Sequence, residues 1–224
     1  MDKLRQYKLI DTDNIPHIGV IGAGSIGSWV VLCLSKLGVS NITVWDFDLV
    51  ESHNQPNQVY RESDIGKPKV QCLHDICQDM SSVKINPVYT KYDGTVCPIL
   101  ICGVDSMSAR KEIWENVKMN YRIKRYWDCR MGGEMASIWS ISPNDVDDIK
   151  TYEETLFSDG EGEDLPCGAK SIGYTNQWIG STMAHQIKCY VMNDDYFTKL
   201  HYGWSPLLMS GKTSKGKLVN NIWK

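Results

Sequence analysis

The first half of the chain alternates short apolar runs with longer amphipathic segments. Residues 17–21 and 42–45 are apolar runs of strand length, which predicts two buried strands. Residues 25–37 and 68–80 repeat apolar side chains at three- and four-residue intervals, which predicts two helices. Gly38 follows the first helical pattern at the position where a helix commonly ends. The pattern therefore predicts strand–helix units from the start of the chain.

This alternation continues as far as residue 128. It predicts a strand over 83–89, a strand over 98–103, a helix over 106–120 and a strand over 125–128. Residues 98–103 are almost entirely apolar, as expected for a parallel strand covered on both faces. Repeated strand–helix units favour an α/β fold with a doubly wound, Rossmann-like and mostly parallel sheet.

The second half has a different pattern. Residues 134–142 alternate in the manner of an antiparallel strand, and 175–192 have helical periodicity. Residues 145–164 hold nine acidic side chains and one lysine, and we expect an irregular segment there. It is either a solvated loop or a lid or docking surface for a basic partner. An exposed basic turn is predicted over 210–217, followed by an edge strand over 218–223.

We therefore expect a single domain over residues 1–224, with antiparallel strands extending the sheet toward the C-terminus. Its nucleotide-binding half would span 17–128 and the extension 129–224, with an acidic crossover over 143–168. The net charge is −3, and no basic stripe suggests nucleic acid as a partner. Neither a membrane span nor a signal peptide is evident, and eight cysteines without a C-x-x-C pair fit reduced thiols in a cytoplasmic protein.

A glycine-rich motif lies between the first predicted strand and helix. Gly22, Gly24 and Gly27 have the G-x-G-x-x-G spacing, and Ser25 opens the helix. In this context the glycines allow a tight turn, a close approach of backbone amides to phosphate, and close helix packing. Asp46 follows the next strand about twenty residues later, where a carboxylate binds ribose hydroxyls. The alternative is a glycine turn that serves packing only.

Further motifs narrow the interpretation. They are Asp46-Phe47-Asp48-x-Val50-Glu51, Asn54, Gln58, Asp64-Ile65-Gly66-Lys67-Pro68-Lys69, and Val104-Asp105 with Arg110. Together with the glycine loop, these motifs resemble the ThiF/MoeB family, the adenylating domains of ubiquitin-like-protein activating enzymes, over roughly residues 5–192.

The resemblance implies a substrate, cofactors and a role for each site residue. It implies ATP and Mg²⁺, a homodimer or pseudo-dimer, and the C-terminal carboxylate of a ubiquitin-like or sulfur-carrier protein as substrate. Asp46 resembles the ribose-binding acid, Lys69 the lysine that neutralises the triphosphate, and Asp105 the magnesium ligand. Residues expected near the nucleotide are Gly22, Gly24, Ser25, Gly27, Asp48, Asn54 and Gln58. Alternatively, Lys69 is a surface lysine, Asp105 a helix cap, Asp48 a loop cap and Arg110 a solvated side chain.

The chain departs from the family at Asn57, where an arginine often precedes the glutamine. Loss of a phosphate-facing arginine costs a few kcal/mol of transition-state stabilisation unless another cation compensates. Arg61, four residues later, is a candidate. Arg5 resembles an N-terminal arginine that some members insert into the partner's site, although a frayed terminal residue is an equal alternative.

Cys167 lies where the family places its reactive cysteine. A thiol on a loop before a helix is a candidate for thioester formation with the acyl-adenylate, or else a structural residue. Cys129 is expected to be structural, and Arg130 to face the nucleotide.

Three further hypotheses stay open. In the first, the chain is a non-catalytic subunit of a heterodimer, which the replacement of the expected arginine by Asn57 suggests. In the second, the chain adenylates a small peptide. A nicotinamide-dependent oxidoreductase also fits Asp46, but such an enzyme has no task for Lys69 and Asp105.

Overall fold

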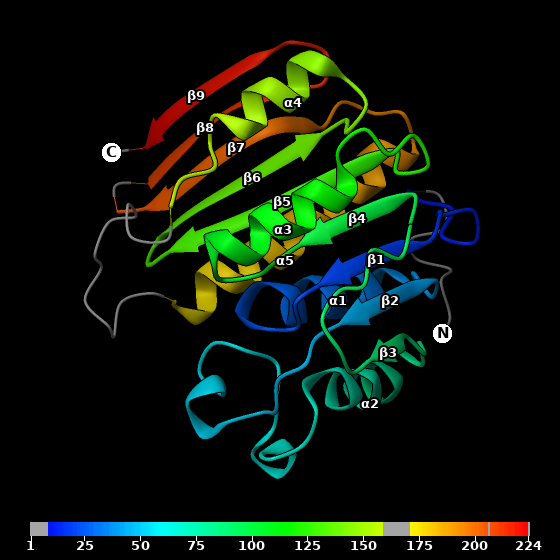
Figure 1. Ribbon diagram of the computed structural model, residues 1–224. Helices are drawn as coiled ribbons and strands as arrows, with labels where there is room; N and C mark the ends of the chain where they lie inside the picture. The colour runs from blue at the N-terminus through cyan, green and yellow to red at the C-terminus, as the bar shows by residue number, and fades with distance from the viewer. Residues whose placement is uncertain (1–8, 159–170, 206, 224) are drawn as a thin grey trace.

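A single nine-stranded sheet forms the centre of the molecule (Figure 1). The computed structural model describes residues 9–158, 171–205 and 207–223. The strand order is β3-β2-β1-β4-β5-β6-β7-β8-β9. The parallel strands are β1 (Ile18–Ile21), β2 (Ile42–Trp45), β3 (Asn86–Val88), β4 (Ile99–Cys102) and β5 (Arg125–Gly132). The antiparallel strands are β6 (Met135–Ile141), β7 (Phe197–Trp204), β8 (Leu207–Thr213) and β9 (Leu218–Trp223).

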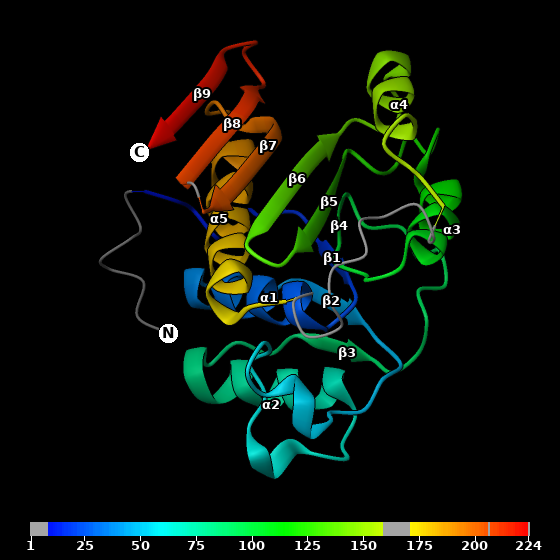
Figure 2. The ribbon, with the colours of Figure 1, turned by 90° about the vertical axis from the view of Figure 1, so that its left-hand side faces the viewer.

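Helices cover both faces of the sheet, as Figure 2 shows from the side. The helices are α1 (Ser25–Leu37), α2 (Lys69–Ser81), α3 (Met107–Val117), α4 (Val146–Glu153) and α5 (Gly173–Val191). One hydrophobic core lies beneath α1, α2 and α5, and a second lies beneath α3 and α4. The two cores explain why β1 and β4 are buried along their whole length. The predicted α/β fold with a doubly wound sheet and an antiparallel extension is confirmed.

The carboxyl ends of the parallel strands form one row. Trp45 pairs with Ile21, Ile21 with Cys102, and Cys102 with Asp128. The chain leaves β1 toward α1 on one face of the sheet, and it leaves β4 toward α3 on the other. The crevice between two strands whose connections diverge in this way is where open α/β sheets bind ligands.

Several predicted elements occur with the expected bounds. α1 covers Ser25–Leu37, and Gly38 ends it with a φ of 95° in the left-handed region that favours glycine. β2 covers Ile42–Trp45. β3 is shorter than predicted. β5 is longer than predicted, because it continues beyond the parallel strands to pair with β6.

The acidic segment was wrongly predicted to be irregular throughout. Within it, α4 spans Val146–Glu153, and the Asp145 side chain accepts hydrogen bonds from the backbone N–H groups of Asp147 and Asp148. An aspartate at the N-cap and acidic residues in the first turn stabilise a helix start. The acidic composition that suggested a loop thus provides the cap of a helix.

The C-terminal part of the sheet was also predicted incompletely. Residues 197–204 form β7, and β8 extends to Thr213, so the basic turn predicted over 210–217 is confined to 214–217. The edge strand predicted over 218–223 is present as β9. Among the described residues, none of the helices has the length and apolar character that a bilayer crossing requires.

Candidate functional site

The glycine loop leaves room for a ligand at the start of α1. Gly22 has a φ of 92°, and a Cβ on Gly27 would lie 1.8 Å from the Gly22 carbonyl oxygen, so both positions require glycine. A Cβ on Gly24 would meet no atom within 4 Å. Gly24 is the N-cap of α1 and offers no side chain to the first amides of the helix. Those N–H groups and the helix dipole suit an anion.

Asp46 is fixed beside this loop. Its carboxylate is 9% exposed and accepts hydrogen bonds from the backbone N–H of Ala23 at 2.6 Å and of Asp48 at 2.7 Å. Burial raises the pKa of Asp46, and the two backbone hydrogen bonds oppose that increase. Each carboxylate oxygen keeps acceptor capacity for a ribose hydroxyl.

Asp48 and Lys69 form an ion pair next to Asp46. The Lys69 ammonium lies 2.9 Å from Asp48 Oδ2, and the Lys69 backbone N–H donates to the Asp48 carbonyl at 3.0 Å. Lys69 is only 6% exposed, whereas half of the Asp48 side chain is accessible. Lys69 is therefore not a surface lysine, and its charge is held close to the proposed ribose acid.

Asn54 and Gln58 shape the segment between β2 and α2. Asn54 is buried, and its Oδ1 accepts a hydrogen bond from the Glu51 N–H at 2.8 Å. Gln58 keeps a buried Oε1 that has no hydrogen-bond partner among the described residues. The Asn57 carbonyl accepts from Trp29 at 3.1 Å and from Asn176 at 2.9 Å. These contacts fix the course of the segment against α1 and α5.

Asp105 follows β4 on the other side of the crevice. The loops after β1 and β4 are in contact, since a Cβ on Gly22 would lie 3.2 Å from the Gly103 carbonyl oxygen. The Asp105 carboxylate is exposed and has no hydrogen-bond or ion-pair partner among the described residues. The proposed helix-cap role of Asp105 is wrong, because Ser106 is the N-cap of α3 and accepts from the Ala109 N–H. The Asp105 side chain is therefore available to a ligand.

Two arginines named in the sequence analysis form ion pairs with aspartates. Arg61 forms ion pairs with Asp64 and Asp79, both at 3.1 Å. Its guanidinium is thus engaged by these two carboxylates and does not replace the arginine expected at position 57. Arg110 is not a solvated residue, since it is 4% exposed and pairs with Asp128.

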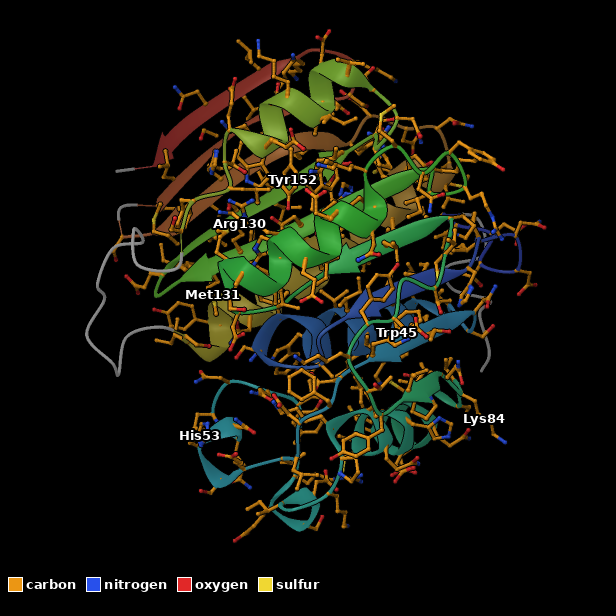
Figure 3. All side chains as sticks on the ribbon, in the orientation of Figure 1. Trp45, His53, Lys84, Arg130, Met131 and Tyr152 are labelled. Atoms are coloured by element: carbon orange, nitrogen blue, oxygen red, sulfur yellow. The ribbon has the colours of Figure 1, made fainter. Side chains whose placement is uncertain are left out.

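The remaining candidates are two cysteines and two arginines, of which Arg5 and Cys167 lie outside the described residues. Cys129 is fully buried, which raises the pKa of its thiol strongly and fits the predicted structural role. The seven described cysteines are free thiols. Arg130 binds Asp128 and Thr155. Figure 3 shows Arg130 near Tyr152, above His53 of the β2–α2 segment in that view.

Tyr60 is a site residue that the sequence analysis missed. Its buried hydroxyl donates to the Ala23 carbonyl at 2.6 Å, while Asp46 accepts from the Ala23 N–H, so both residues hold the glycine loop at Ala23. Only the proximity of residues 23 and 60 identifies it, and no motif marks it in the sequence.

The assembled residues suit a phosphorylated nucleotide. Loop amides, the ammonium of Lys69 and a ribose-type acid occupy one side of the crevice, and an exposed carboxylate occupies the other. The described residues contain no cluster of three or more potential metal ligands. Mg²⁺ commonly uses one or two protein carboxylates together with phosphate oxygens and water, so Asp105 fits such an ion when a nucleotide supplies the phosphates.

Comparison with known proteins gives a consistent result. The chain is 30% identical over 135 residues to the NEDD8-activating enzyme E1 catalytic subunit of Arabidopsis thaliana, which covers 50% of this chain and 30% of that protein. It is 39% identical over 64 residues to the adenylyltransferase and sulfurtransferase MOCS3 of Arabidopsis thaliana, covering 28% of this chain and 14% of that protein. The chain thus spans less than a third of the length of these relatives.

Solved structures share the fold over almost the whole chain. A crystal structure of PaaA matches with a TM-score of 0.71 and 18% identity, covering 98% of this chain and 72% of that one. E. coli MccB with ATP matches with a TM-score of 0.62 and 16% identity, covering 98% and 66%. The profile of the ThiF family matches residues 5–195. Together with the geometry of the site, this match shows that the chain belongs to the ThiF family.

Proposed function

We propose that this protein uses Mg-ATP to adenylate a carboxylate at the C-terminus of a protein or peptide. The glycine loop and the first turn of α1 would hold the phosphates, and Asp46 would accept hydrogen bonds from the ribose hydroxyls. Lys69 would neutralise the triphosphate, and Asp105 would hold Mg²⁺. The ion would neutralise phosphate charge and orient the triphosphate.

The position of Lys69 carries this proposal. Its ammonium is buried and paired with Asp48, two residues after the ribose acid Asp46. A nicotinamide site needs the glycine loop and Asp46 but has no use for a cation and an exposed carboxylate at this position. A triphosphate, which carries several negative charges, uses both.

The reaction requires positioning and charge neutralisation. A carboxylate oxygen of the substrate attacks the α-phosphorus of ATP, the bond to the bridging oxygen breaks, and pyrophosphate leaves. The nucleophile is already ionised at neutral pH, so no general base is needed. The transition state is then stabilised by the loop amides and Lys69.

We propose a ubiquitin-like or sulfur-carrier protein ending in glycine as the substrate. Support comes from the relatives, which include an enzyme that activates NEDD8 and an adenylyltransferase and sulfurtransferase. Within this proposal the enzyme is a cytoplasmic homodimer and Arg5 serves the partner's site. The Cys167 thiolate attacks the acyl carbon of the adenylate, a thioester forms and AMP leaves.

ATP–pyrophosphate exchange tests the adenylation step. The protein, Mg-ATP and labelled pyrophosphate should form labelled ATP only when a suitable carboxylate substrate is added. Thermal shifts measured with Mg-ATP and with NAD(H) separate the proposal from a dehydrogenase, because a bound ligand stabilises the native state. Stabilisation by NAD(H) and not by Mg-ATP would contradict adenylation.

A peptide substrate is the second candidate. The fold resembles MccB, which has been solved with ATP and with N-formylated MccA. Exchange stimulated by short peptides and not by carrier proteins would favour it. If the chain is instead a non-catalytic subunit, ATP binding is weak or absent and exchange appears only when a second chain is added.

A further inference from the structure

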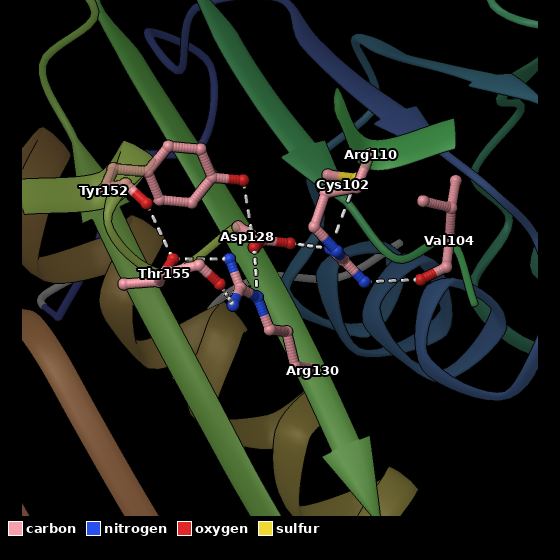
Figure 4. A network of polar contacts seen from close by, with 7 residues as sticks. All are labelled: Cys102, Val104, Arg110, Asp128, Arg130, Tyr152 and Thr155. Atoms are coloured by element: carbon pink, nitrogen blue, oxygen red, sulfur yellow. Dashed lines mark hydrogen bonds and ion pairs between the residues drawn. The ribbon is translucent and has the colours of Figure 1, made fainter. Parts of the chain in front are cut away.

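A buried ionic network lies beside the proposed metal-binding turn (Figure 4). Its centre is Asp128 on β5, whose side chain is fully buried. Asp128 Oδ1 accepts a hydrogen bond from Arg110 Nη1 on α3. Asp128 Oδ2 accepts from Arg130 Nε at 2.6 Å and from the Tyr152 hydroxyl at 3.0 Å. Both carboxylate oxygens are thus occupied, which fixes the orientation of the group.

Arg110 has a second contact that reaches the turn after β4. Its Nη2 donates to the Val104 carbonyl at 2.6 Å, and Nη1 lies 3.7 Å from Cys102 Sγ. The Val104 carbonyl and the Asp105 N–H belong to one planar peptide unit. Ser106, the next residue, is fixed as the N-cap of α3. Asp105 is therefore held between a peptide unit bound by Arg110 and the start of a helix.

The network has more than a stabilising role. A buried ion pair seldom adds net stability over well-packed apolar side chains, because both charges lose their hydration. What the pair provides is geometry, since the planar guanidinium binds Asp128 with one nitrogen and Val104 with another. An apolar residue at position 110 could fill the space but would leave the Val104 carbonyl without the hydrogen bond that Arg110 donates.

We propose that Arg110 is a positioning residue for Asp105. Asp128 holds the guanidinium, and the guanidinium holds the turn that presents the Asp105 carboxylate to the metal ion of a bound triphosphate. This inference rests on the proposed function, in which Asp105 binds Mg²⁺. The two terminal nitrogens of Arg110 already bind Asp128 and the Val104 carbonyl, so its effect on a bound nucleotide is exerted through the Asp105 turn.

Arg110→Lys provides the test. Lysine keeps the charge that balances Asp128, but its single ammonium cannot reproduce the two-sided contact of the guanidinium. The matched control is Arg122→Lys, the same change at an exposed position. Two quantities are measured in the full chain: deuterium uptake of residues 103–107, and the Mg²⁺ concentration that half-saturates ATP binding.

We expect Arg110→Lys to raise the half-saturating Mg²⁺ concentration by about 10-fold or more, as loss of a residue that orients a metal ligand does. ATP binding without Mg²⁺ should stay within about twofold, and uptake at 103–107 should rise while β1 stays protected. In an Asp105→Asn background, Arg110→Lys should add no further increase. Arg122→Lys should behave as wild type throughout.

Two results would overturn the inference. One is a folded Arg110→Lys protein with unchanged Mg²⁺ dependence and unchanged uptake at 103–107. The other is a full additional effect in the Asp105→Asn background. If Arg110→Lys does not fold, Tyr152→Phe removes one donor to Asp128 without changing charge, and both quantities should still rise measurably. If the wild-type protein does not bind Mg-ATP, the proposed function is refuted. Deuterium uptake at 103–107 in Arg110→Lys then still tests whether Arg110 holds the turn.

Discussion

Lys69 is the residue whose removal most directly tests the site. Lys69→Ala deletes the buried cation beside Asp46, and we expect ATP–pyrophosphate exchange to fall by about 100-fold or more, as for other groups that stabilise transition-state charge. Folding should persist, because Asp48 is half-accessible and recovers its hydration when the pair is lost. Lys67→Ala, two residues earlier and exposed, is the control and should retain exchange. Equal rates in the two variants would exclude Lys69 from the reaction.

Asp46 gives the site a pH dependence with opposite signs for stability and binding. Burial raises its pKa above the ordinary value of 3.8, so the folded protein holds this proton more tightly than the unfolded chain does. Its contribution to stability is complete below pH 3.8 and is lost as the pH rises through the folded-state pKa. ATP affinity should rise over the same pH range, because the ionised carboxylate accepts hydrogen bonds from the ribose hydroxyls.

Asp46→Asn isolates both effects of this proton. The unfolding free energy of the wild type minus that of the variant, measured in urea at several pH values, should decrease as the pH rises above 3.8. ATP binding to the variant should be weak and should lack the increase that Asp46 gives the wild type over the same pH range. A constant difference in unfolding free energy would show that Asp46 does not titrate there.

At the scale of elements, the strand–loop–helix unit separates folding from binding. Gly27→Ala places a Cβ 1.8 Å from the Gly22 carbonyl, and we expect a loss of at least about 3 kcal/mol of stability, because backbone must move. Gly24→Ala meets no atom within 4 Å and should cost about 1 kcal/mol or less, the usual difference at an N-cap. It should nevertheless weaken ATP binding, since the methyl group occupies the space left for phosphate. Calorimetric titration with Mg-ATP and urea unfolding measure the two effects separately.

The start of α4 gives a prediction that is independent of the nucleotide. Asp145→Ala removes an acceptor for two backbone N–H groups and should destabilise the protein by about 0.5–2 kcal/mol in urea unfolding. Asp145→Asn retains a side-chain oxygen and should stay within a few tenths of a kcal/mol of wild type. If both variants lose the same stability, the charge of Asp145 matters and its capping hydrogen bonds do not.

At the scale of the whole molecule, α1 and α5 meet at Gly180. A Cβ there would lie 2.8 Å from the Trp29 carbonyl oxygen, so Gly180→Ala forces the two helices apart. We expect a net loss of about 1–3 kcal/mol in urea unfolding, despite the higher helix propensity of alanine. Ser181→Ala on the exposed side of α5 should change stability by less than about 0.5 kcal/mol. A stabilised Gly180→Ala protein would show that the helix contact can relax.

The sequence itself determined the first half of the fold and much of the site. The elements β1, α1 and β2 follow from local periodicity and from glycines whose backbone conformation only glycine adopts readily. Such elements depend on interactions over short sequence distances, which a linear pattern records. Lys69 and Asp48 are 21 residues apart, and only the family resemblance placed both of them beside the nucleotide.

The tertiary structure alone decided the rest. The contacts of Tyr60 with Ala23 and of Arg110 with Asp128 join segments that no sequence period connects. The same holds for β7 and β8, which are stabilised by pairing with β6 and with each other and not by their own pattern. A buried polar group is stable only when it meets its partner, and the sheet register selects that partner. The strand ends in this register therefore bring the Asp105 turn, Arg110 and Asp128 into one network beside the glycine loop.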